Sequence, residues 1–164
     1  MARITQLKAG EEYMLKLSRY GKDFERIAQK AIYAAAGMVA DKIKANIRAL
    51  PEEPYRRLKA GDQFAGISRQ QKQDLIASFA IAPMAADEKG DINTKLGFDG
   101  YGSRPTKKYP KGLPNQLLAR SIESGSSVRK KHPFVRPAVR ATKQAAIEKM
   151  NAIIEEETRN HFGR

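Results

Sequence analysis

One stretch of the chain decides the fold, and it reads DFERIAQKAIYAAAGMVADKIKANIRAL over residues 23–50. Its apolar residues recur at steps of three and four, which is the spacing of one face of an α-helix. Asp23 is a candidate N-cap for this helix, and Pro51 follows it as a stop. The pattern predicts a helix about 40 Å long at 1.5 Å per residue. Gly37, inside a run of alanines, would allow the close approach of another helix or a sheet.

A second long helical pattern closes the chain. It begins at PFVRPA, residues 133–138, where proline near a first helical turn removes no helical hydrogen bond. Apolar residues then recur at helical spacing, which predicts a helix over 134–160. A brief helix is also expected over 9–19, ahead of the first long one.

Shorter elements are predicted between the two long helices. Residues 51–67 are loop-like, and Ser68 is expected to cap the short helix that follows. Another helix is expected over 114–123, ended by Gly125. Its apolar side is expected to hold Leu117, Leu118 and Ile122.

An antiparallel hairpin is predicted from two strand patterns, 78–84 and 92–98, on either side of a turn at 88–91. A further strand, from this chain or a partner, is expected beside it, because isolated hairpins are marginally stable. The length of 164 residues suggests one domain over 1–164. The predicted fold class is α+β, with long N- and C-terminal helices packed on a small antiparallel sheet.

The charge of the chain is strongly positive and unevenly placed. The formal net charge is +13, and residues 101–140 hold ten basic residues against one acidic residue, Glu123. Much of this excess falls in two polar loops, 100–112 and 126–132. Burial of unpaired charge is prohibitive, so this block is expected to face water, a polyanion or an acidic protein surface. The candidate contact residues are Arg104, Lys107, Lys108, Lys111, Arg129, Lys130, Lys131 and Arg136.

The residues offer no arrangement for catalysis. The absence of cysteine excludes disulfides, thiolate zinc sites and a cysteine nucleophile. The two histidines, His132 and His161, do not have metal-site spacing, and there is no phosphate-binding glycine loop. We therefore expect a chain that is not an enzyme, with no catalytic residues, cofactor or metal. No apolar run reaches the roughly 18 residues of a membrane helix, and the first residues lack an apolar signal core, so a cytoplasmic protein is expected.

Two binding hypotheses fit the basic loops. Lysine and arginine contact phosphates without regard to sequence, and the neighbouring Tyr55 and Tyr109 could stack on bases if a strand were single. An acidic patch on another protein would suit the same charges.

Several motifs in order resemble one protein family. They are PFVRPA at 133–138 before a long helix, ARSIESG at 119–125, the helix-to-strand step DLIASF at 74–79, the long helix over 23–50, and the early segment 7–17. This order resembles the gene-product-ten-like family of lambdoid siphophages, which are neck, head–tail joining or tail-completion proteins. Loop 100–112 departs from the family by being longer and more basic, so interface positions there are not carried over.

The resemblance implies a non-enzymatic structural role in virion morphogenesis at the phage head–tail junction. It implies a homo-oligomer, with a ring as the expected form, next to neck, connector or tail-terminator proteins. It also implies a place in the virion, with the host cytoplasm as the site of assembly. Non-specific contact with packaged double-stranded DNA stays open, and so does the alternative of a small basic nucleic-acid-binding protein. Within the motif, Phe134 is expected to enter the core and Pro137 to pre-set the first turn, with Arg136 and Arg140 on one face.

Overall fold

The computed structural model describes residues 21–162, so the helix expected over 9–19 lies outside the described residues. The described chain is α+β, as predicted. Its elements are α2 (Lys22–Ala49), α3 (Arg69–Ser78), β1 (Phe79–Ile81), β2 (Ala85–Ala86), β3 (Ile92–Asn93), β4 (Leu96–Phe98), α4 (Asn115–Ser124) and α5 (Val135–Phe162).

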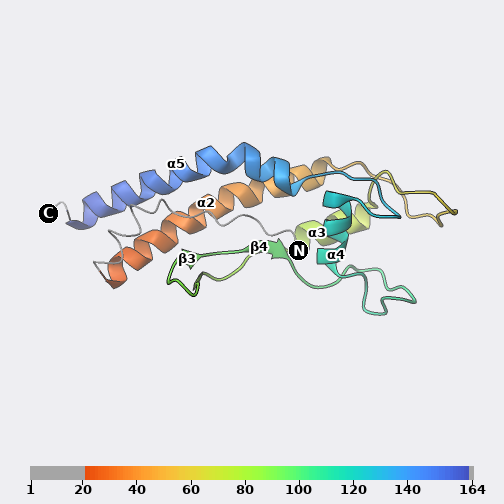
Figure 1. Cartoon of the computed structure of the whole chain (residues 1–164), viewed down its shortest axis with the longest axis horizontal. Helices are drawn as coiled ribbons and strands as arrows, with labels where there is room; N and C mark the ends of the chain where they lie inside the picture. The colour runs from red at the N-terminus through yellow and green to blue at the C-terminus, as the bar shows by residue number, and fades with distance from the viewer. Residues whose placement is uncertain (1–20, 163–164) are drawn as a thin grey trace.

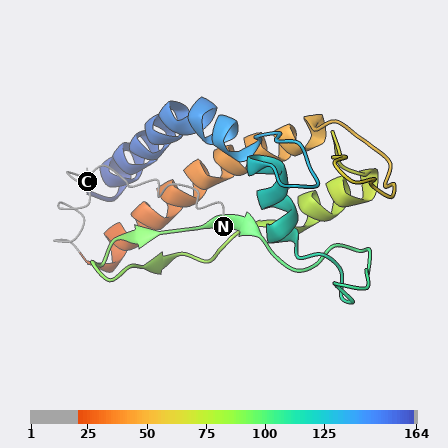
Figure 2. The same ribbon diagram turned by 45° about the vertical axis from the view of Figure 1, so that its right-hand side comes forward.

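The two 28-residue helices, α2 and α5, lie side by side and antiparallel (Figures 1 and 2). Near the start of α5, the side-chain amide of Asn46 donates to the carbonyl oxygen of Phe134 at 2.9 Å. Toward the other end, the ammonium of Lys30 pairs with the carboxylate of Glu157. These two contacts fix the register of the helix pair along most of its length.

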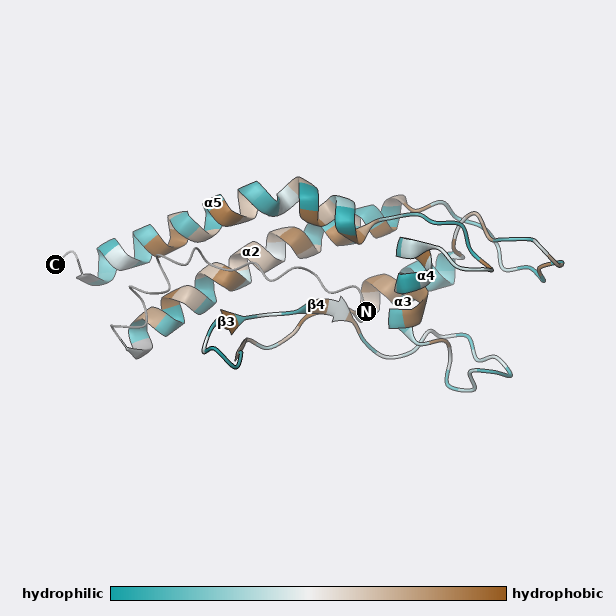
Figure 3. Cartoon of the chain, viewed as in Figure 1, coloured by the Kyte–Doolittle hydropathy of each residue, from teal (hydrophilic) through white to brown (hydrophobic). Residues whose placement is uncertain are grey.

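Helix α2 forms the middle layer, between α5 and the hairpin (Figure 1). Apolar residues line it, while hydrophilic residues mark the outward side of α5 (Figure 3). The largest fully buried side chains of α2 are Ile27, Ile32, Val39, Ile43 and Ile47. Phe134 is only 1% exposed and meets the ring of Phe98 edge-on at 6.0 Å, which confirms that it enters the core.

The predicted hairpin is present but shorter than expected. β1 pairs antiparallel with β4, and β2 pairs with β3, so the two ladders belong to one hairpin. Between the ladders lies Pro83, which has no N–H to donate, and the hydroxyl of Thr94 donates to the carbonyl oxygen of Ala82 at 2.6 Å. No third strand joins the hairpin within residues 21–162, and α2 packs against it instead.

Of the two helix N-caps predicted from the sequence, one is wrong and one is confirmed. Gly21, with φ of +82°, occupies the N-cap of α2, so the prediction that Asp23 caps this helix is wrong. Asp23 lies in the first turn instead, where a negative charge suits the helix dipole. The cap of α3 is confirmed, because Ser68 and Gln71 form a reciprocal capping box.

Helix α4 shows one error in the predicted apolar side. Leu117 points outward and is 43% exposed. The buried residues of α4 are Asn115, Leu118, Ala119, Ile122 and Glu123. Two polar residues are thus buried in this helix, and one of them holds the start of α5.

Candidate interaction surface

Three loops gather at the end of the helix pair where α2 ends and α5 begins (Figures 1 and 2). They are loops 51–67, 100–112 and 126–132, which we call the loop end. Most of the predicted contact residues are exposed there: Arg104, Lys107, Lys108, Lys111, Lys130 and Lys131. The structure therefore brings the two predicted basic loops to one place, together with a third loop.

Loops 51–67 and 126–132 are joined through their backbones. The N–H of Phe64 donates to the carbonyl oxygen of Val128 at 2.9 Å, and the N–H of Lys130 donates to the carbonyl oxygen of Phe64 at 2.9 Å. These paired bonds hold Lys130 at a fixed position relative to loop 51–67.

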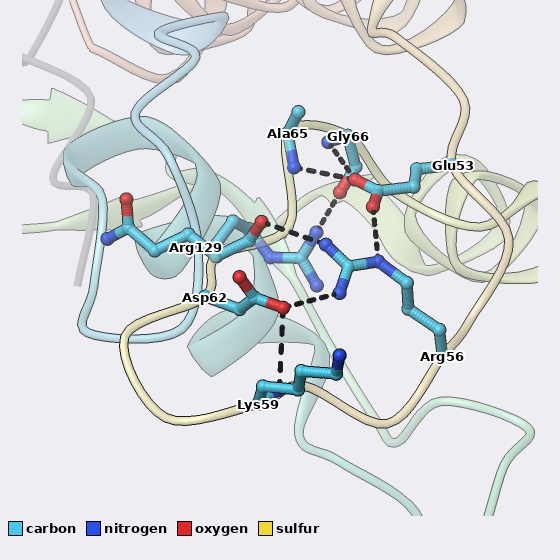
Figure 4. A network of polar contacts seen from close by, with 8 residues as sticks. Glu53, Arg56, Lys59, Asp62, Ala65, Gly66 and Arg129 are labelled. Atoms are coloured by element: carbon cyan, nitrogen blue, oxygen red, sulfur yellow. Dashed lines mark hydrogen bonds and ion pairs between the residues drawn. The ribbon is translucent and has the colours of Figure 1, made fainter.

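Glu53 organises loop 51–67 from within (Figure 4). Its carboxylate accepts from the N–H groups of Ala65 at 2.6 Å and Gly66 at 3.1 Å, and from Arg56 Nε at 3.1 Å. Desolvation would raise the pKa of Glu53, but these hydrogen bonds outweigh it and leave the pKa below its ordinary value. Arg56 also donates to Asp62 at 3.1 Å, and hydrogen bonds to Asp62 and Glu53 raise the pKa of Arg56.

Arg129 corrects the prediction that the whole basic block faces outward. It is 7% exposed, and its guanidinium donates to the carbonyl oxygen of Gly66 (Figure 4). The same group lies 5.3 Å from the centre of the Phe64 ring. Burial lowers the pKa of Arg129, and the charge of Glu53 partly opposes this. Arg129 is therefore a residue that holds loops together, and it does not present its charge to a partner.

Arginine and aromatic side chains from all three loops stack on one another. The guanidinium of Arg104 lies 3.7 Å from the centre of the Tyr55 ring, and Tyr55 stacks on Phe64 at 5.9 Å. Arg56 and Arg129 lie 5.6 Å and 5.3 Å from the Phe64 ring. We call these five residues the arginine–aromatic stack. Tyr55, next to Arg56 and Arg57, was a candidate from the sequence. Phe64 was not, because a single aromatic residue in a polar loop forms no recognisable pattern.

Loop 100–112 is anchored at its base. The N–H of Ser103 donates to the carboxylate of Asp74 in α3 at 2.8 Å. At the other side of the loop, Gly112 has φ of +98°, and a Cβ there would lie 1.9 Å from the carbonyl oxygen of Gly102. Only glycine fits at position 112, because the two ends of the loop backbone lie so close together there. The lysines of the loop are thus carried on a fixed base.

Glu123, the lone acid of the basic segment, caps α5. Its buried carboxylate accepts from the N–H groups of Phe134 at 2.7 Å, Val135 at 2.9 Å and Arg136 at 3.0 Å. Arg136 also brings its Nε to 3.8 Å from this carboxylate, although its side chain is 68% exposed. This role was not expected from the sequence, in which its one signal is an acidic residue shortly before PFVRPA.

Two buried polar atoms lack a hydrogen-bond partner among the described residues, Asn115 Oδ1 and His132 Nε2. Between residues 21 and 162 there is no group of three or more His, Cys, Asp or Glu side chains that could hold a metal ion. None of the helices in this range has the length and apolar character needed to cross a membrane.

Comparison with protein-family models, with curated proteins and with solved structures finds no match to this chain. The description of the loop end therefore rests on its geometry alone, which is that of a basic surface formed by three loops in contact with one another.

Proposed function

We propose that this chain is a non-enzymatic structural subunit of a tailed-phage head–tail junction, acting in the neck or in tail completion. It assembles as a homo-oligomer, with a ring as the expected form, and contacts neighbouring neck, connector or tail-terminator proteins. It resides in the virion after assembly in the host cytoplasm.

One observation carries this proposal: Glu123 caps α5 at Phe134. The two residues come from ARSIESG and PFVRPA, two of the motifs whose order carries the resemblance to phage morphogenesis proteins. A direct bond between them gives a physical reason for the motifs to occur together in this order. A mere coincidence of short sequence patterns would not require such a contact.

The shape of the chain also supports a role in assembly. The α2–α5 pair is long and offers outward faces along its length, while the basic loop end extends from one tip (Figure 1). An elongated subunit of this kind packs side by side with copies and leaves one end for a different neighbour. Exposed charges at that end favour orientation and specificity over raw affinity.

The test is deletion of the gene from the phage or prophage that encodes it. We expect filled heads and free tails that do not join, or tails that end wrongly, and rescue by the wild-type gene supplied in trans. Mass photometry of the purified chain should show a discrete oligomer. Normal infectious particles from the deletion would overturn the proposal.

The second candidate is a small basic nucleic-acid-binding protein, favoured by the exposed lysines of loop 100–112. A purified monomer that binds nucleic acid, together with a deletion that leaves particle assembly intact, would favour this candidate.

A further inference from the structure

We propose that the loop end binds the phosphate backbone of double-stranded DNA without regard to sequence. This inference rests on the proposed function and deepens it by naming the partner of the loop end. Three observations support it: most cations of these loops lie outside ion pairs, the loops are held together by contacts between them, and cations already lie against two of the aromatic rings.

The three loops of the loop end hold ten basic residues and three acidic ones, a net charge of +7. Loop 51–67 has three acidic residues: Glu52 pairs with Lys72 at 3.1 Å, while Glu53 and Asp62 both pair with Arg56. Loops 100–112 and 126–132 contain no acidic residue at all. These carboxylates therefore offset only part of the positive charge of this end.

Most of the positive charges, in contrast, lie outside ion pairs. Arg56 is the one cation of the three loops that makes an ion pair within the described residues. The exposed cations outside any ion pair are Arg57, Lys59, Arg104, Lys107, Lys108, Lys111, Lys130 and Lys131. Such a cluster of free charges raises the local concentration of a polyanion and gains affinity from the counterions that the polyanion releases.

The loops are preorganised to present these charges. Arg104 stacks on Tyr55, and Tyr55 on Phe64, so loop 100–112 is tied to loop 51–67. The backbone bonds between Phe64 and Lys130 add loop 126–132 to the same unit. Less conformational entropy is then lost when the surface engages a partner.

The composition of this surface favours phosphates over an acidic protein. Six of its eight free cations are lysines, a residue type depleted in protein–protein interfaces. Protein–DNA interfaces are more polar and more positively charged than protein–protein interfaces. Three of the five large exposed apolar or aromatic side chains of the described residues also lie here, Tyr55, Tyr101 and Val128, but the free cations outnumber them.

The aromatic rings favour a duplex over a single strand. Single-stranded nucleic acid is held by bases stacked on free aromatic faces. The Tyr55 ring already has the Arg104 guanidinium and the Phe64 ring against it. Tyr109 is half-buried and has the Lys108 ammonium 5.5 Å from its centre. Tyr55 and Tyr109 thus already have cations against them, whereas Tyr101 is 57% exposed. One open ring gives less stacking than the successive bases of a single strand require, so the backbone phosphates are the group to be bound.

The test measures binding of the full chain to a fluorescent 30-base-pair duplex by anisotropy, from low to high salt. We expect binding at low salt that is independent of sequence, with log affinity falling linearly against log salt. The triple variant Lys107→Gln/Lys108→Gln/Lys111→Gln should weaken binding and reduce the steepness of this slope by about 2 to 3, because each lost phosphate contact removes about 0.9.

The matched control removes the same charge elsewhere. Lys89→Gln/Lys95→Gln/Lys149→Gln changes three exposed lysines on the hairpin and α5, and it should leave the slope nearly unchanged. Equal effects of the two triple variants would overturn the inference, as would no duplex binding at low salt. Tighter binding to a single strand, or to polyglutamate as a probe for an acidic protein, would overturn it too.

Failure of this inference is separable from failure of the proposed function. A discrete oligomer that joins heads and tails but does not bind DNA refutes only the inference. A monomer that binds DNA, with normal assembly in its absence, refutes the proposed function and leaves the phosphate-binding surface in place.

Discussion

The carboxylate of Glu123 accepts a hydrogen bond from the backbone N–H of Phe134 at 2.7 Å, and both residues are buried. The same carboxylate serves the N–H groups of Val135 and Arg136. The first N–H groups of a helix have no partner inside the helix, and a negative charge there also suits the helix dipole. One side chain from α4 thus fixes where α5 begins and how it meets α4.

Replacement of Glu123 should therefore destabilise the chain in graded steps. Glu123→Gln keeps one acceptor oxygen and should lower the free energy of unfolding by about 1–2 kcal/mol, and Glu123→Ala by about 3 kcal/mol, since buried N–H groups lose their acceptor. Urea unfolding followed by circular dichroism measures both. Glu148→Gln, on the exposed side of α5, should stay within about 0.5 kcal/mol of wild type. A similar loss in Glu148→Gln and Glu123→Ala would contradict the capping role.

The long helices could be predicted because their patterns are local and sustained. Apolar residues recur at steps of three and four through the whole of α2, and Pro51 lies just beyond its end. Each repeat indicates the same buried face of the helix. The burial of Phe134 followed from its place at the start of α5. The hairpin could be predicted in position but not in length, because the Pro83 region interrupts the ladder.

The buried polar contacts of Glu123 and Arg129 could not be predicted, because both depend on backbone groups far along the chain. Glu123 binds N–H groups 11 to 13 residues away, and Arg129 binds the carbonyl oxygen of Gly66, 63 residues away. A charge pattern records the ionic residues but not the peptide groups that will lie next to them. Glu123 and Arg129 were therefore counted with the surface charge, although both are buried.

The buried guanidinium of Arg129 should control the order of loop 51–67. Arg129→Met removes the donor to Gly66 and the cation beside the Phe64 ring, and should cost about 2 kcal/mol. Arg129→Lys should rescue little, since an ammonium lacks the planar fork of the guanidinium. Limited trypsin digestion should cleave faster at Arg57 in both variants. Lys130→Met, next in sequence but exposed, should be cleaved at the wild-type rate; faster cleavage there as well would argue against a specific role for Arg129.

The lowered pKa of Glu53 predicts an acid-sensitive loop. A carboxyl group whose pKa is lower in the folded state stabilises that state fully at a pH above its unfolded pKa, and this stabilisation is lost as the pH falls through the folded pKa. The stability difference between wild type and Glu53→Gln should thus be constant near neutral pH and shrink in acid. Unfolding curves over a series of pH values measure it. A difference that grows in acid would reverse the assigned sign.

Two glycines should respond in opposite directions to the same substitution. Gly37 lies in the middle of α2, and a Cβ there meets nothing within 4 Å. Gly37→Ala should therefore raise the free energy of unfolding by about 0.5–1 kcal/mol through helix propensity alone. At Gly66, in contrast, a Cβ would lie 2.4 Å from the carbonyl oxygen of Pro51. It would push the backbone at Pro51 and Glu52 away.

Gly66→Ala should accordingly destabilise the chain by about 1–3 kcal/mol, because the clash is with backbone that cannot rotate aside. Thermal unfolding of both variants measures the two stability changes in one experiment, and we expect them to have opposite signs. The oligomeric state of Gly37→Ala adds a second reading. Among residues 21–162 nothing lies within 4 Å of a Cβ at Gly37. Weaker assembly of a more stable subunit would therefore indicate that a neighbouring copy packs against this part of α2, whereas unchanged assembly would place the subunit contacts elsewhere.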